Sequence, residues 1–137
     1  MLEGDPVVEV QVSTFPGSRL PHVWLDIAER GNFTSTLDLA GKGRFCLLTG
    51  VEGEAWRDAA KNIQEKHGIP IVTYGIGPGL DYIDVYRDWF RKRGVEEDGC
   101  VLVRPDRFVA WRSVKLTDNC ELKLMQAFNQ ILSLHEL

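Results

Sequence analysis

The stretch that most constrains the fold is residues 44–75, because it holds two strand patterns with a helix pattern between them. Residues 44–49, RFCLLT, are a short apolar run, and residues 53–67, GEAWRDAAKNIQEKH, follow almost at once. In 53–67 the apolar residues Trp56, Ala59, Ala60 and Ile63 recur at helical spacing, and Gly68 ends the helix. The β-branched residues of 69–75 predict a second strand. Together these elements predict two parallel strands joined by a right-handed crossover.

A second helix is predicted over residues 83–93, IDVYRDWFRKR. Asp81 is a candidate N-cap for it, and Gly94 is suited to its C-terminal end. Its basic end, Arg91-Lys92-Arg93, suits the negative end of the helix dipole, and we favour this over nucleic-acid binding.

A hairpin and a last helix complete the pattern. In residues 100–112, CVLVRPDRFVAWR, two apolar runs flank the turn 104–107, which has proline at its second position. Residues 120–133 predict a helix begun by Asp118 or Asn119, with one apolar face of Leu122, Met125, Phe128 and Leu132. The order from residue 44 is β-α-β-α-β-β-α, which predicts an α/β fold of the thioredoxin-like sandwich type.

The N-terminal part carries weaker signals. We expect residues 1–18 to be an extended lead-in and residues 19–137 to form one domain. The alternation of Val8, Val10 and Val12 could add an edge strand between two prolines. A loop or short hairpin through Gly31 is expected before the first confident strand.

The turn after residue 48 lacks the chemistry of a disulfide reductase. A thioredoxin-type redox centre would place Cys-x-x-Cys there, and this chain has Thr49-Gly50-Val51-Glu52. The three cysteines, Cys46, Cys100 and Cys120, have neither redox nor metal-ligand spacing, so we predict buried thiols at 46 and 100 and no metal. An odd cysteine count and the lack of an apolar leader favour a reducing, cytoplasmic location.

Charge and hydropathy exclude two classes of partner. The formal net charge is −4, and the 16 Lys and Arg residues are spread along the chain, so no basic stripe indicates nucleic-acid binding. No window approaches the roughly 18 apolar residues of a membrane span. We therefore expect a protein that binds neither nucleic acid nor membrane.

Several segments resemble a known family: PGSRLPHVWL, STLDLAGKGRFCLLTG, EAWRDAA, YGIGPGLDYIDVYRDW and DGCVLVRPDRFVAWRS. Together they are similar to the C-terminal domain of FAD-dependent aromatic hydroxylases of the phenol hydroxylase and chlorophenol monooxygenase class. The similarity covers about residues 5–115. It implies a thioredoxin-like domain without redox cysteines, which in that family serves dimerisation or support rather than hydroxylation.

The chain departs from a complete flavin hydroxylase. Such an enzyme needs Gly-x-Gly-x-x-Gly after its first strand, where backbone amides approach the pyrophosphate. GKGRFC lacks the third glycine and precedes a strand, and in GIGPGL a proline interrupts the spacing. Because Met1 lies almost at the start of the similarity, we expect no nucleotide-binding domain here, no bound cofactor, and no hydroxylation by this chain alone.

Candidate catalytic residues are His22, Arg19 and Tyr86. His22 could act as a general acid or base or polarise a substrate carbonyl, or it could simply order its loop. The aromatic and polar residues able to line an apolar pocket are equally suited to core, interface or capping roles. These candidate substrate-binding residues are Trp24, Trp56, Tyr74, Asp81, Tyr82, Trp111 and Arg112.

Two functions of different classes follow. One is a small cofactor-free enzyme that binds an apolar, oxygenated natural-product intermediate and promotes a cyclisation, an isomerisation or a pericyclic step of the Diels-Alder type. Such reactions need a dry cavity and one well-placed hydrogen-bond donor. The other is a non-catalytic dimerisation or assembly domain, present as a homodimer or docked on a flavin hydroxylase. The start at Met1 leads us to expect the small enzyme.

Overall fold

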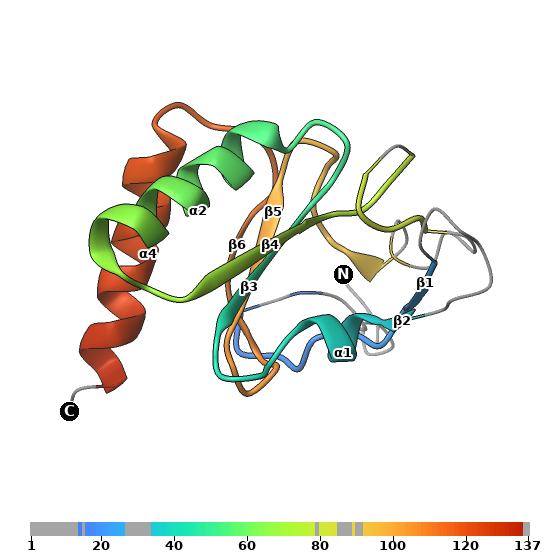
Figure 1. Cartoon of the computed structure of the whole chain (residues 1–137), viewed down its shortest axis with the longest axis horizontal. Helices are drawn as coiled ribbons and strands as arrows, with labels where there is room; N and C mark the ends of the chain where they lie inside the picture. The colour runs from blue at the N-terminus through green and yellow to red at the C-terminus, as the bar shows by residue number, and fades with distance from the viewer. Residues whose placement is uncertain are drawn as a thin grey trace, which may run out of the picture.

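The computed structural model describes residues 14, 16–26, 34–78, 80–84, 89 and 92–135, and for residues 132–135 the backbone alone. Its centre is a four-stranded mixed sheet in the order β4-β3-β5-β6 (Figure 1). Strand β4 pairs parallel to β3, β5 pairs antiparallel to β3, and β6 pairs antiparallel to β5. The strands are β3 (Phe45–Thr49), β4 (Ile71–Gly75), β5 (Cys100–Val103) and β6 (Val109–Ser113).

Two helices, α2 (Glu54–His67) and α4 (Cys120–His135), lie on the same side of this sheet (Figure 1). Alternation along the strands sends Phe45 and Leu47 to this side. They pack against the apolar face of α2 and against Leu124 and Phe128 of α4. Gly68 ends α2 in the left-handed conformation at φ 70°.

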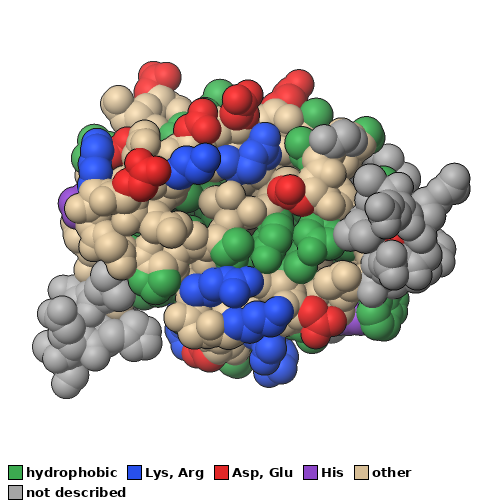
Figure 2. All heavy atoms as spheres, viewed as in Figure 1, with side chains coloured by type: hydrophobic (Ala, Val, Ile, Leu, Met, Phe, Trp, Pro, Cys, Tyr) green, Lys and Arg blue, Asp and Glu red, His purple; other side chains and the backbone are tan. Residues whose placement is uncertain are grey.

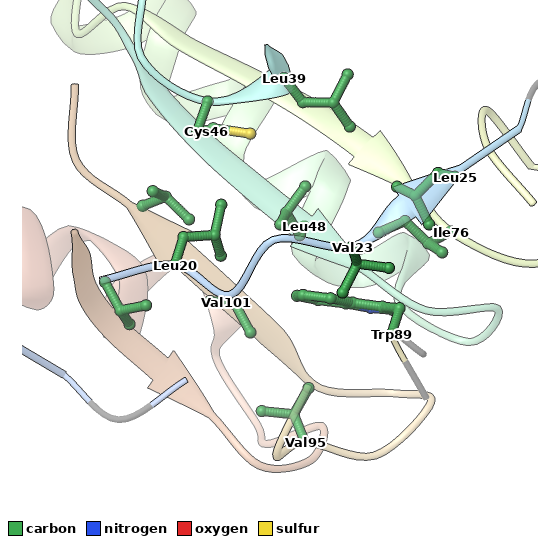
Figure 3. Close-up of a cluster of buried hydrophobic side chains, with 13 residues drawn as sticks. Leu20, Val23, Leu25, Leu39, Cys46, Leu48, Ile76, Trp89, Val95 and Val101 are labelled. Atoms are coloured by element: carbon green, nitrogen blue, oxygen red, sulfur yellow. The ribbon is translucent and has the colours of Figure 1, made fainter. Parts of the chain in front are cut away.

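The opposite side of the sheet is covered by the N-terminal part of the chain (Figure 3). Here lie the two-stranded sheet of β1 (Trp24–Leu25) and β2 (Thr34–Ser35) and the short helix α1 (Thr36–Leu39). Cys46 and Leu48 of β3 pack here with residues from the N-terminal segment, α1 and the region after β4, among them Leu20, Val23, Leu25, Leu39 and Trp89. The sheet therefore has a buried core on both faces.

The α/β fold predicted from the sequence is confirmed. The β3–α2–β4 crossover, the β5–β6 hairpin and the last helix all occur where the sequence predicts them. The short hairpin before β3 is confirmed by the antiparallel pairing of β1 with β2, although Gly31 lies outside the described residues. The N-terminal edge strand and most of the predicted helix 83–93 also lie outside them; residues 89 and 92 have helical backbone.

Two local predictions need correction. The four-residue helix α1 was not expected; Ser35 caps it by accepting the Leu37 amide, and Thr36 ties it to the N-terminal segment. The predicted apolar face of α4 is wrong at Leu122, which is 55% exposed, whereas Leu124 is fully buried. The buried face is rotated because α4 packs against α2 and the sheet through Leu124, Ala127 and Phe128. The carbonyl of Asn119 accepts the Lys123 amide, so Asn119, one of the two expected residues, is the N-cap of α4, which begins at Cys120.

Within the described part of the chain, no helix combines the length and the apolar character that a bilayer crossing requires.

Candidate functional site at the end of β3

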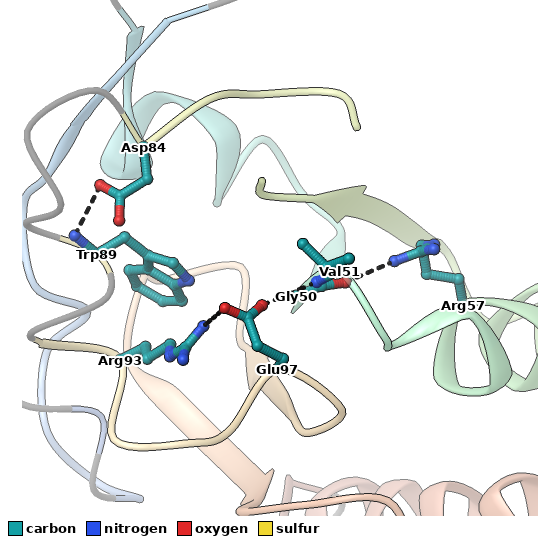
Figure 4. A network of polar contacts seen from close by, with 7 residues as sticks. All are labelled: Gly50, Val51, Arg57, Asp84, Trp89, Arg93 and Glu97. Carbon is teal, nitrogen blue, oxygen red and sulfur yellow. Dashed lines mark hydrogen bonds and ion pairs between the residues drawn. The ribbon is translucent and has the colours of Figure 1, made fainter. Parts of the chain in front are cut away.

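The turn that follows β3 is closed by Glu97, from the loop that precedes β5 (Figure 4). One carboxylate oxygen of Glu97 accepts the Val51 amide at 3.0 Å, and its backbone carbonyl accepts the Glu52 amide at 3.1 Å. Residue 50 must be glycine for this approach, since a Cβ there would lie 2.7 Å from the Glu97 carbonyl oxygen. The backbone amides that a redox or anion-binding turn would offer to a ligand are thus occupied from within the chain.

Arginine side chains hold this turn from two directions. Arg93, which is 7% exposed, places its guanidinium 3.2 Å from the other carboxylate oxygen of Glu97. Arg57 of α2 donates to the Thr49 hydroxyl at 2.6 Å and to the Gly50 carbonyl at 3.2 Å. The two cations approach the turn from opposite sides in Figure 4. The turn is therefore fixed by charge-assisted hydrogen bonds.

Two hollows adjoin this turn and share Arg93 and Glu97. The larger is an open hollow of about 570 Å³ lined by Glu52 and residues 93–98. Its lining residues include five with ionisable side chains: the carboxylates of Glu52, Glu96, Glu97 and Asp98 and the guanidinium of Arg93. The smaller, of about 130 Å³, is lined by Val51, Ile76, Gly77, Pro78, Ile83, Asp84, Trp89, Arg93 and Glu97. Asp84 accepts the Trp89 amide at 3.0 Å, which fixes the wall of the smaller hollow.

The two buried cysteines of the sheet, Cys46 of β3 and Cys100 of β5, lack thiolate character. Burial raises the pKa of the Cys46 thiol from 9.0 to about 12, against a smaller lowering by Arg44, and burial also raises the pKa of Cys100. Both side chains are fully buried, as predicted from the sequence. At neutral pH these thiols are protonated and cannot act as nucleophiles. Among the described residues, no group of three or more His, Cys, Asp or Glu side chains is arranged to hold a metal ion.

The predicted residues of the N-terminal segment lie on the surface. His22 is exposed, with its Nδ1 2.7 Å from the Ser35 hydroxyl and its ring centroid 4.8 Å from that of Trp24. Trp24 is 47% exposed. Arg19 is exposed and lies over the Phe108 ring, 5.9 Å from its centroid. His22 and Trp24 are thus brought together, and Arg19 makes a separate contact.

The predicted tryptophans of the core form a second group. Trp56 is fully buried, its indole N–H donates to the Asp98 carbonyl at 2.9 Å, and its centroid lies 5.8 Å from that of Trp111. Arg112 donates to the Thr14 hydroxyl at 3.2 Å. Trp56 therefore holds the backbone of Asp98, a residue that lines the larger hollow, without lining the hollow itself.

The predicted tyrosines form a third group. The ring centroids of Tyr74 and Tyr82 are 5.5 Å apart, and the Asp81 carboxylate accepts the Gly75 amide at 2.8 Å. Burial, followed by the nearby Tyr74 and Asp81, raises the pKa of Tyr82. In the view of Figure 2, which is the view of Figure 1, hydrophobic side chains gather near β4. Tyr86 lies outside the described residues.

The nine predicted residues that the structure describes thus fall into separate groups, and none of them is among the residues that line the two hollows. Sequence reasoning missed Glu97 and placed Arg93 only in a basic helix end. The segment VEEDG offered no motif for Glu97. The signal that could have found it is its position, directly before β5 and thus beside the end of β3 in an antiparallel pair.

Comparison with known proteins identifies the relatives of this chain. The family model "Aromatic-ring hydroxylase, C-terminal" matches residues 13–133. Phenol 2-monooxygenase of Pseudomonas sp. (strain EST1001) is 43% identical over 91% of this chain and 20% of that protein. The 2,4-dichlorophenol 6-monooxygenase of Delftia acidovorans is also 43% identical, over 88% of this chain and 20% of that protein. The chain thus spans about one fifth of the length of these relatives.

Solved structures give the same result. The flavin-dependent monooxygenase PieE, in complex with FAD and substrate, is 41% identical and aligns with a TM-score of 0.82 over 97% of this chain and 22% of that chain. Aklavinone-11 hydroxylase, in a ternary complex with FAD and aklavinone, is 33% identical and aligns with a TM-score of 0.74 over 84% of this chain and 21% of that chain. With the family model and the sequence identities, these alignments show that the chain belongs to the family of aromatic-ring hydroxylase C-terminal domains.

Proposed function

We propose that this chain is a non-catalytic C-terminal domain of an FAD-dependent aromatic-ring hydroxylase, and that it supports the part of the enzyme that holds the flavin and the aromatic substrate. Family membership supplies the hydroxylase context. The observation that supports the non-catalytic role is the closed turn after β3. Glu97 accepts the backbone amides of Val51 and Glu52, so the turn cannot offer them to a ligand. The buried, protonated thiols of Cys46 and Cys100 support the same role.

The substrate class follows from the relatives, and for this chain it is part of the proposal. The relatives include enzymes named for phenol and 2,4-dichlorophenol and one solved with aklavinone. We propose that the enzyme served by this domain hydroxylates an aromatic ring that already carries oxygen. The FAD would be held by the part of the enzyme that this chain does not match.

A hybrid enzyme tests the proposal. The segment of PieE that aligns with this chain would be replaced by residues 13–133, the family-matched region. We expect the hybrid to hydroxylate the PieE substrate, because the replaced segment contributes support and no reacting group. A Cys46→Ala hybrid should be as active as the unmodified hybrid. A hybrid that is folded and retains FAD but forms no product would contradict the proposed role.

The cofactor-free cyclase predicted from the sequence stays a prediction. It needs a dry apolar cavity onto which His22 or Arg19 converges, and among the described residues these two are exposed and line neither hollow. Native mass spectrometry of the purified chain with host extract tests it. A retained apolar metabolite, lost in a His22→Ala variant, would support the cyclase over the support domain.

A further inference from the structure

We infer that the end of the sheet beside Glu97 is the surface through which this chain docks on the flavin-binding part of the hydroxylase, and that the larger hollow receives a partner segment bearing a Lys or Arg side chain. This inference rests on the proposed function and goes further by naming the surface and the chemistry of the segment that it receives. Three observations on separate parts of the chain point to this surface.

The first observation is where the chain enters the domain. The family match begins at residue 13, and the family is described as C-terminal, so in the relatives the remaining four-fifths or so come before this point. Thr14 is fully buried, and its hydroxyl donates to the Arg93 carbonyl and accepts from Arg112. Because Arg93 lines both hollows, the connection to the flavin-binding part would arrive beside them.

The second observation is that apolar side chains are exposed at the same end of the sheet, beside Glu97. Val51 is 45% exposed and lines the smaller hollow, and Val114 is 47% exposed. Val114 adjoins the larger hollow, because its carbonyl accepts the Glu96 amide at 2.6 Å. Apolar side chains of this size at a rim contribute to association when a partner covers them.

The third observation is charge. The larger hollow combines four carboxylates with Arg93, whose guanidinium is already paired with Glu97. The net charge of the side chains that line the hollow is therefore negative. A partner segment with a cationic side chain is complementary to it, and an acidic segment is excluded. A cationic side chain flanked by apolar residues matches both the hollow and its rim. A small anionic ligand such as a phosphate does not match this lining.

Titration of the chain into the flavin-binding part of PieE, prepared without its aligned segment, kept in excess FAD and shown by circular dichroism to be folded, tests the inference by calorimetry. Glu96→Lys reverses a charge in the hollow and Val114→Asp places a charge on its rim. Each should weaken binding about tenfold, as loss of a well-placed interface contact does. The matched controls are Glu65→Lys, on an exposed position of α2, and Trp24→Asp, at a side chain of equal exposure elsewhere. Both controls should stay within about twofold of the unmodified chain.

The outcomes separate this inference from the proposed function. Binding that the hollow variants leave unchanged, or that a control weakens as much, would overturn the docking surface while leaving the proposed function intact. The absence of any binding by the unmodified chain to a PieE part that is folded and supplied with FAD would overturn both. If sedimentation instead shows that the chain self-associates, and Glu96→Lys and Val114→Asp abolish this, the occupant is a second copy and the inference is wrong. All variants change exposed side chains, so equal thermal midpoints should confirm that they fold.

Discussion

Glu97 should be the residue whose removal most weakens the turn after β3. Glu97→Ala deletes the carboxylate that accepts the Val51 amide and pairs with Arg93. A hydrogen bond from an amide to a charged acceptor contributes about 1.5–3 kcal/mol. The ion pair adds at most about 1 kcal/mol, because the Glu97 side chain is 42% exposed and water screens it. We therefore expect a loss of about 1.5–4 kcal/mol in the free energy of unfolding.

A graded series separates the two contributions. Glu97→Gln keeps an oxygen that can accept the Val51 amide and loses the charge, so it should cost about 1 kcal/mol. Glu96→Gln changes the neighbouring exposed carboxylate and should stay within about 0.5 kcal/mol of the unmodified chain. Urea unfolding at pH 7 measures the free energy of unfolding of the three variants. An unchanged slope of this free energy against urea concentration shows that their denatured states are comparable. If Glu97→Ala is as stable as Glu96→Gln, the closure of the turn by Glu97 is not a stabilising feature.

The remaining predictions concern the core, a helix end and the thiols. Leu124→Ala should cost about 2–5 kcal/mol in urea unfolding and Leu122→Ala less than about 0.5 kcal/mol, since the first is fully buried and the second 55% exposed; equal costs would contradict the observed face of α4. Gly68→Ala should cost about 1 kcal/mol, because φ is 70° and no atom crowds an added Cβ. Cys46 and Cys100 should resist a thiol reagent in the native chain and react after unfolding; rapid native reaction would contradict their burial. Because the unfolded Cys46 thiol ionises near pH 9.0 and the folded one near about 12, the free energy of unfolding should fall as pH rises through this window, and a Cys46→Ala variant should lose part of that slope.

The fold could be predicted because its main elements have strong local patterns. The apolar run of β3, the amphipathic face of α2 and the stop at Gly68 all agree with the structure. α1 could not be predicted, since four residues carry no helical period and Thr36 is fixed by Pro21, 15 residues earlier in the chain. The face of α4 was misassigned because Leu122 and Leu124 are both apolar, and only packing against α2 distinguishes them.

The closed turn could be predicted only in part. The sequence shows that Thr49-Gly50-Val51-Glu52 lacks cysteines. It does not show that Glu97, 46 residues further along, supplies the acceptor for the Val51 amide, because that contact depends on the pairing of β3 with β5. The predicted site residues were chosen by side-chain type, and residues of one type are distributed over the sheet, the core and the surface. Where each of them lies is decided by tertiary packing.

The measurement that tests the central claim most directly is the FAD content of PieE lacking its aligned segment, compared with the same protein fused to residues 13–133 of this chain. Both would be passed through gel filtration, and flavin absorbance would be measured per protein molecule. The support role predicts that the fusion retains FAD and the truncated protein loses most of it. Equal FAD content in the two, with the fused domain folded, would contradict a supporting role for this domain.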